Sequence, residues 1–163
     1  MRTLLRLSDT LFLGGAALFC AGFFVCVLLQ VVYRYVLEAP LPWTEELARY
    51  LFVWAAMLAA AVSVGRNDQF NIAIFADSLG PRGRFRIELL IVFLGLVFAL
   101  ILVWYGSAMS RRMMIAVSPV LPVPQGAVYL VLPIAGAYMT LHLGWRFAGL
   151  LNGRVKAKDG PAW

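Results

Sequence analysis

Four long apolar stretches, separated by short charged or proline-rich segments, make up most of this chain. In the first and third stretches no Asp, Glu, Lys or Arg occurs between Asp9 and Arg34, or between Glu88 and Arg111. About 20 apolar residues in a helix cross the ~30 Å hydrocarbon layer of a bilayer. Backbone polar groups in lipid must also be paired within their own segment. The pattern therefore predicts an all-α integral membrane protein with four transmembrane helices.

The predicted spans cover residues 9–35, 43–65, 84–112 and 125–151. Prolines, which cannot donate a backbone hydrogen bond, precede the second span and the fourth: Pro40, Pro42, Pro119, Pro122 and Pro124. The second span is short for a crossing, because only 16 residues separate Arg49 from Arg66. The whole chain, residues 1–163, is predicted to be a single membrane domain.

Two segments outside the spans have their own patterns. Residues 69–79 place Ile72, Phe75 and Leu79 on one face, so we expect a short amphipathic helix lying in the membrane interface. The third helix then begins near Arg82 and is expected to continue beyond the membrane, as far as Val117. The polar tail, residues 152–163, is expected to be frayed.

The distribution of positive charge predicts the orientation. Ten of the 14 Lys and Arg residues lie near the N-terminus, in the connection between the second and third spans, or near the C-terminus. Cytoplasmic loops carry the excess of Lys and Arg in membrane proteins. Both termini are therefore expected in the cytoplasm.

Composition narrows the class further. Hydrophobic residues are 63% of the chain and charged residues 13%, which leaves almost no material for a domain outside the membrane. The net charge of +6 comes from residues at the ends of the apolar runs, not from a basic stripe interleaved with aromatics. The pattern argues against nucleic-acid binding.

The residues that usually carry redox or catalytic chemistry are scarce. His142 is the sole histidine, so haem ligation by two histidines of this chain is excluded. Cys20 and Cys26, six apart on one helix, lie on different faces and beyond disulfide reach. No catalytic constellation or metal-ligand spacing stands out. We expect no enzyme, and no cofactor or metal in this chain.

The middle of each span lacks charged residues, although a transporter working alone normally carries a charged or polar site there. Gln30, Ser63, Thr140 and His142 are the polar candidates. They do not form a central cluster in the sequence. For His142 an interfacial or interhelical hydrogen bond is favoured over a proton relay.

Small residues recur at four-residue spacing on two spans, where they let helix backbones approach closely. The second span has Ala55, Ala59 and Ser63, and the fourth has Gly136, Thr140, Gly144 and Ala148. These stripes serve either packing within the four helices or docking against another subunit. The sequence leaves both open.

The segment that starts the second span combines aromatic and charged residues at a membrane surface. Glu45 and Arg49 are four residues apart, which suits an ion pair on one helix face. Charged groups beside a short span are usually paired. We therefore predict a protein or lipid contact here, made by Arg34, Trp43, Glu45, Glu46, Arg49 and Tyr50.

These residues carry a resemblance to a known family. Arg34-Tyr35, the segment Trp43-Thr44-Glu45-Glu46-Leu47-Ala48-Arg49, and an Ala-rich span ending at Gly65-Arg66 resemble the small membrane subunit of tripartite ATP-independent periplasmic (TRAP) transporters, the Q or DctQ-type subunit. The four-span layout and Leu79-Gly80-Pro81-Arg82 extend the likeness over nearly the whole chain. One departure occurs after Arg66: the family usually has a His and then a Val-Asp pair, whereas this chain has Gln69 and Ile72-Ala73.

The resemblance implies a multi-pass protein of the bacterial inner membrane, bound as a heterodimer to a large transport subunit of the DctM (M) type. It implies that a periplasmic substrate-binding protein delivers an organic acid and that a sodium gradient drives symport. Substrate and sodium sites would lie on the large subunit, and this chain would be a fixed scaffold. Phospholipids are further expected partners.

Two other functions remain possible from the residues alone. One is an autonomous four-helix secondary transporter acting as a homo-oligomer, for which Glu45, Glu46 and Glu88 are the available carboxylates. The other is a membrane redox enzyme, which the single histidine and the unpaired cysteines disfavour.

Overall fold

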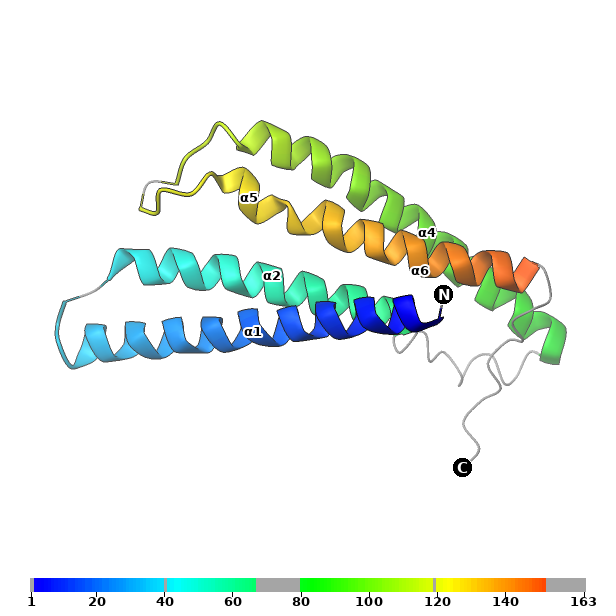
Figure 1. Ribbon diagram of the computed structural model, residues 1–163, viewed down its shortest axis with the longest axis horizontal. Coiled ribbons are helices and arrows are strands. Elements are labelled where there is room, and N and C mark those ends of the chain that lie inside the picture. Colours follow the sequence, from blue (N-terminus) through cyan, green and yellow to red (C-terminus); the bar gives the residue numbers. More distant parts are fainter. Residues whose placement is uncertain (1, 40, 67–79, 119, 152–163) are drawn as a thin grey trace, which may run out of the picture.

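The computed structural model describes residues 2–39, 41–66, 80–118 and 120–151, which are mostly helical (Figure 1). The helices are α1 (Arg2–Tyr35), α2 (Pro42–Arg66), α4 (Gly80–Met113), α5 (Gln125–Tyr129) and α6 (Val131–Leu151). Within these ranges, four segments are long and apolar enough to span a membrane: Ser8–Tyr35, Pro42–Gly65, Phe85–Met113 and Gln125–Leu151. The predicted all-α membrane fold is confirmed, and each predicted span agrees to within one residue at either end. The segments predicted at 69–79 and 152–163 lie outside the described residues.

The long helices pack in the order α1, α2, α6, α4 (Figure 1). α1 and α2 form one antiparallel hairpin, α4 and α6 form another, and α2 packs on α6 to join them. In the described part of the chain α1 and α4 do not pack extensively on each other. Within the most apolar window of each span, 44% of the residues of the fourth are buried, against 11% for the first and third. α1 and α4 are thus edge helices with broad apolar faces.

Small side chains make the contact between the two hairpins. Ala61 of α2, Ala99 of α4 and Ala135 of α6 are fully buried in one cluster with Tyr138 and Met139. Because alanine adds only a methyl group, the backbones approach closely, which supplies dispersion energy where lipid removes the hydrophobic driving force. The sequence thus places its smallest side chains where α2, α4 and α6 meet.

The connection after α4 ends that helix earlier than expected. α4 stops at Met113, not near Val117, because the chain leaves the helix there and Val117 pairs with Pro124 in an isolated antiparallel bridge. The backbone bonds of this connection run from Ser118 N–H to the Val123 carbonyl (3.2 Å) and from Gln125 N–H to the Ala116 carbonyl (2.9 Å). α4 still has 34 residues, or ~51 Å at the helical rise, so it exceeds the membrane thickness as predicted.

The fourth span is two helices, α5 and α6, separated at Leu130. Pro133 has no N–H to donate to the carbonyl of Tyr129, and its ring crowds that carbonyl. α5 ends at Tyr129 for this reason. The Ile134 N–H, bonded to the Leu130 carbonyl at 3.3 Å, resumes the helical pattern.

Candidate functional site

The segment at the start of α2 holds the turn that follows α4. Glu46 accepts hydrogen bonds from the Ser118 hydroxyl and the Tyr50 hydroxyl, which reaches back from one helical turn further on. The Ser118 Oγ also accepts the N–H groups of Val120 (3.3 Å) and Leu121 (3.2 Å). We call Glu46, Tyr50 and Ser118 the Glu46 cluster. It ties the first turn of α2 to the proline-rich connection.

α1 supports the same end of α2. The Gln30 side-chain amide donates to the Thr44 carbonyl at 3.0 Å, and the buried Thr44 hydroxyl donates to the Leu41 carbonyl at 2.7 Å. Both bonds are accepted by backbone carbonyls where the turn after α1 runs into α2. Gln30, the polar residue in the first span, therefore stabilises the α1–α2 turn.

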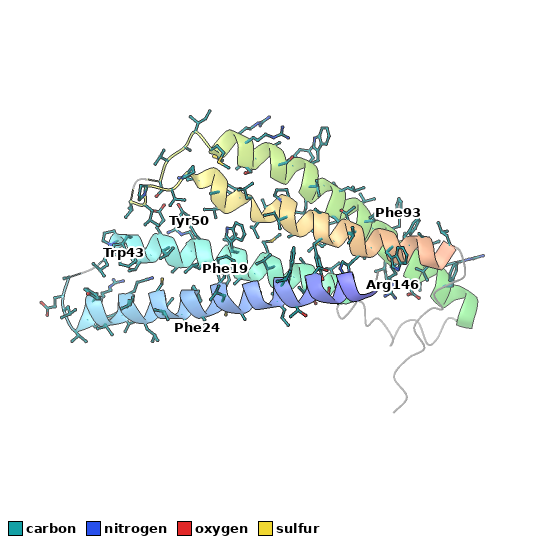
Figure 2. All side chains as sticks on the ribbon, viewed as in Figure 1. Phe19, Phe24, Trp43, Tyr50, Phe93 and Arg146 are labelled. Atoms are coloured by element: carbon teal, nitrogen blue, oxygen red, sulfur yellow. The ribbon has the colours of Figure 1, made fainter. Side chains whose placement is uncertain are left out.

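The other residues of the predicted contact segment face outward. Glu45 and Arg49 form the ion pair that their spacing predicts, at 3.4 Å, with side chains 72% and 68% exposed. Trp43 is exposed at the start of α2, with Tyr50 further along (Figure 2). The guanidinium of Arg34 lies 5.9 Å from the Tyr35 ring centre, a cation–π contact. Their contact with a protein or lipid partner stays a prediction.

A second polar cluster joins α1 to α6 at the opposite end of the helices. The Tyr138 hydroxyl donates to Asp9 Oδ1, and His142 Nε2 lies 3.5 Å from the same oxygen. The Tyr138 ring stacks on Phe12 and on His142, with ring centres 4.3 Å apart in both pairs. We call Asp9, Tyr138 and His142 the Asp9 cluster.

α2 closes over this cluster at a glycine. A Cβ at Gly65 would lie 2.9 Å from Tyr138 Cε1 and 3.2 Å from His142 Nδ1, so a larger residue would displace both rings. The His142 side chain is only 8% exposed. The histidine therefore faces a carboxylate on another helix, but its buried Nε2 has no hydrogen-bond partner among the described residues, so the hydrogen bond favoured from the sequence stays a prediction.

An ion pair joins α6 to α4 one turn further along α6. Arg146 donates to Glu88, and the two side chains are 21% and 15% exposed. Figure 2 shows Arg146 near the end of α6, far from Trp43. Neither this pair nor Tyr138–Asp9 was predicted. The available signal was the position of opposite charges just inside predicted span ends, but which groups meet depends on helix order and rotation.

In the structure, some positions of the two predicted small-residue stripes are closely packed and others are open. Gly136 is a close approach: a Cβ there would lie 3.0 Å from the Ala99 carbonyl of α4. The Thr140 hydroxyl donates to the Gly136 carbonyl at 2.8 Å. By contrast, the Cβ position at Gly144 meets nothing within 4 Å. On the remaining stripe positions, Ala55 is buried, Ser63 half-buried, and Ala59 and Ala148 exposed. Internal packing explains Gly136 and Ala55 but not Gly144.

Comparison with known proteins decides the family. Residues 23–153 match the sequence profile described as "Tripartite ATP-independent periplasmic transporters, DctQ component". The chain belongs to this DctQ family. The resemblance seen at the Trp43–Arg49 segment is thereby confirmed, and because the family consists of transporter permease subunits, so is the expectation that this chain is not an enzyme.

Named relatives fall into two architectures. A TRAP transporter small permease protein of Haemophilus influenzae is 27% identical over 136 residues, covering 81% of this chain and 84% of the relative. The sialic acid TRAP transporter small permease protein SiaQ of Vibrio cholerae is 28% identical, covering 69% and 65%. The isethionate TRAP transporter permease protein DctMQ of Oleidesulfovibrio alaskensis is 28% identical over 74% of this chain, but only 20% of that relative is covered. This DctQ-family protein is thus a multi-pass membrane protein that matches a minor part of a larger permease chain.

Proposed function

We propose that this DctQ-family chain is the fixed small subunit of a sodium-driven TRAP transporter in a bacterial inner membrane. It braces a large DctM-type subunit, which holds and moves an organic acid received from a periplasmic substrate-binding protein. Both termini of the chain face the cytoplasm, and phospholipids cover the apolar faces that no protein occupies.

One observation supports a bracing role above the others. The partly buried carboxylates of the described spans, Asp9, Glu46 and Glu88, are each engaged by side chains of this chain. Buried charge that is satisfied within a subunit fixes its helices, whereas a carrier site must release and recapture its cargo. Asp9–Tyr138 and Glu88–Arg146 lie between helices, and Glu46–Ser118 ties α2 to the connection after α4, as a rigid support requires.

The relatives support the partner and the substrate class. The DctMQ relative is a single permease chain in which 80% lies outside the matching region, room for a large transport subunit. The names of relatives specify sialic acid and isethionate, and both are organic acids. We take these two compounds as the first probes.

The partner is tested by purification from native membranes. Tagged chain is expected to retain a DctM-family protein through detergent exchange and size exclusion, identified by mass spectrometry. Migration as a homo-oligomer free of that protein would favour the autonomous transporter and contradict the proposal.

Transport is tested in liposomes with sialic acid and isethionate as separate probes. Vesicles with both membrane subunits, the cognate binding protein and an inward sodium gradient are expected to accumulate a probe. Replacing sodium by potassium is expected to abolish uptake. Vesicles with this chain alone are expected to accumulate neither, and sodium-dependent uptake by the chain alone would overturn the bracing role.

A further inference from the structure

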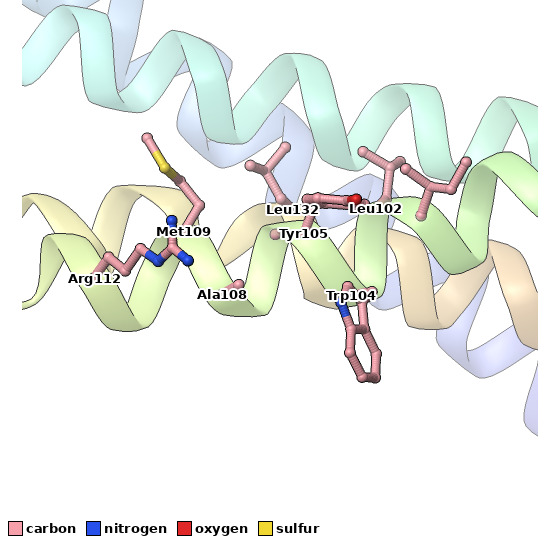
Figure 3. A pocket seen from close by; sticks show the side chains of 9 residues that line it. Leu102, Trp104, Tyr105, Ala108, Met109, Arg112 and Leu132 are labelled. Atoms are coloured by element: carbon pink, nitrogen blue, oxygen red, sulfur yellow. The ribbon is translucent and has the colours of Figure 1, made fainter.

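An apolar hollow of about 440 Å³ lies on the edge helix α4, with one residue of α6 at its base (Figure 3). The lining residues come from about three turns near the end of α4 and from the start of α6: Ile101, Leu102, Trp104, Tyr105, Gly106, Ala108, Met109, Arg112 and Leu132. Trp104 is 75% exposed and Tyr105 69% exposed. Aromatic residues, Met and Arg are the types enriched in protein interfaces.

The spacing of the lining residues fits a partner helix. Ile101, Tyr105, Ala108 and Arg112 follow one another at intervals of four, three and four residues. This 3–4 alternation produces the straight seam along which a second helix inserts its side chains. Ala108 lies within the seam and permits close approach, as small residues do between membrane helices.

Two adjacent arginines lie at the end of the seam, and they differ in their hydrogen bonding. Arg111 folds back on its own helix, donating from Nε to the Ser107 carbonyl (3.2 Å) and from Nη2 to the Ser107 hydroxyl (3.4 Å). Arg112 lines the hollow, and within residues 80–118 and the other described ranges it has no hydrogen-bond or ion-pair partner. A guanidinium at the end of a membrane span is suited to a carboxylate, which it binds through two parallel hydrogen bonds.

The other edge helix lacks this combination. The exposed large residues of the α1 span are mainly aliphatic, such as Leu18 (72%) and Leu28 (64%). Its terminal arginine, Arg34, already lies over the Tyr35 ring. Apolar exposure and 3–4 spacing alone do not distinguish the two edges, because Leu18, Val25, Leu28 and Val32 of α1 are exposed at the same spacing. The α4 edge differs in having an arginine, Arg112, on the seam itself.

We propose that this α4 surface docks one transmembrane helix of the large subunit, and that an acidic side chain of that helix pairs with Arg112. The inference rests on the proposed function, because it takes the large subunit as the partner. It adds that the edge helix α4 makes the contact and that Arg112 sets the register of the docked helix.

The first test compares the two arginines in the co-expressed complex. Arg112→Gln is expected to lower the yield of large subunit retained on the tagged chain by at least about tenfold, which corresponds to ~1.4 kcal/mol. Arg111→Gln is the matched control and is expected to stay within twofold of wild type, and Arg112→Lys is expected to restore part of the yield. Equal yields for the Arg111→Gln and Arg112→Gln variants would overturn the pairing.

The second test leaves Arg112 intact. A photo-crosslinking amino acid, p-benzoylphenylalanine, replaces Tyr105 on α4 or, as the control, Leu28 on α1. Illumination of native membranes is expected to link the large subunit to position 105 and not to position 28. Linkage at position 28 alone would overturn the assignment of α4 while leaving the proposed function standing.

Two further outcomes have distinct meanings. Loss of a tightly bound phospholipid from the Arg112→Gln complex in native mass spectrometry, with the large subunit retained, would identify a lipid headgroup as the partner of Arg112 and overturn the inference. Failure of the wild-type chain to bind any DctM-family protein would contradict the proposed function itself.

Discussion

At the scale of single residues, the charged groups at the start of the short second span lie in two environments, one exposed and one partly buried. Glu45 and Arg49 stay exposed and pair with each other, while Glu46 turns toward Ser118 and Tyr50. A carboxylate removed from water requires such donors. The Trp43–Tyr50 segment therefore has an internal role through Glu46 and leaves its outward residues available to a partner.

The role of Glu46 predicts a local effect of Glu46→Ala. Without the carboxylate, Ser118 loses its acceptor, and the connection at residues 116–125 is expected to open more often. Thermolysin, which cuts beside Val and Leu, should then cleave at Val117–Leu121 several-fold faster. Glu45→Ala is the control, because the Glu45 side chain is 72% exposed, and it should leave the cleavage rate unchanged. Equal acceleration in both variants would show that Glu46 does not hold this turn.

The Glu88–Arg146 pair predicts an effect on global stability. Glu88→Gln leaves a partly buried guanidinium without its counter-ion and is expected to lower the free energy of unfolding by about 3 kcal/mol. The double variant Glu88→Leu/Arg146→Met removes both charges and should recover most of that loss. The measurement is reversible unfolding in mixed micelles, and a double variant no more stable than Glu88→Gln would contradict this account.

At the scale of elements, close helix approach depends on particular glycines. Gly136→Leu would force α6 away from Ala99 of α4, and overpacking of this kind costs about 1–3 kcal/mol. Gly144→Leu, on the same helix but with open space at its Cβ, should change the unfolding free energy of the isolated chain by less than about 0.5 kcal/mol. Comparable losses for the two variants would show that α4 and α6 do not meet at Gly136.

Sequence patterns predicted the elements well because membrane helices are limited by length and by proline. Asp9, Arg34, Glu88 and Arg111 marked the ends of two apolar runs, and each predicted span agrees with the structure. The break at Leu130 was not predicted although Pro133 was visible, because some membrane helices tolerate proline when neighbours satisfy the freed carbonyl. Whether the helix continues through Pro133 or breaks depends on whether the Tyr129 carbonyl finds another partner.

At the scale of the whole molecule, the packing order of the helices, α1, α2, α6, α4, could not be predicted from the sequence. The helices are apolar on most sides, so hydropathy does not say which neighbour each one chooses. For the same reason, Tyr138–Asp9 and Glu88–Arg146 could not be matched in advance. The Trp43–Arg49 segment gave the family, because its residue types are specific where the spans are not.

The Asp9 cluster predicts energetic coupling between the two hairpins. Asp9→Asn and Tyr138→Phe each remove one side of the same hydrogen bond, so their combined effect should fall short of the sum by about 0.5–2 kcal/mol. Asp9→Asn with Thr140→Val is the control, since the Thr140 hydroxyl bonds within its own helix, and these effects should add. Additive effects in both cycles would mean that this bond does not couple the hairpins.

The packing order also bears on how the chain is made. α1 and α2 are neighbours in sequence as well as in space, so this pair can form while later segments are still on the ribosome. The closing step is the arrival of α6, which must find α2 on one side and α4 on the other. If α6 failed to insert, the α1–α2 pair and α4 would therefore both be present, but nothing would join them.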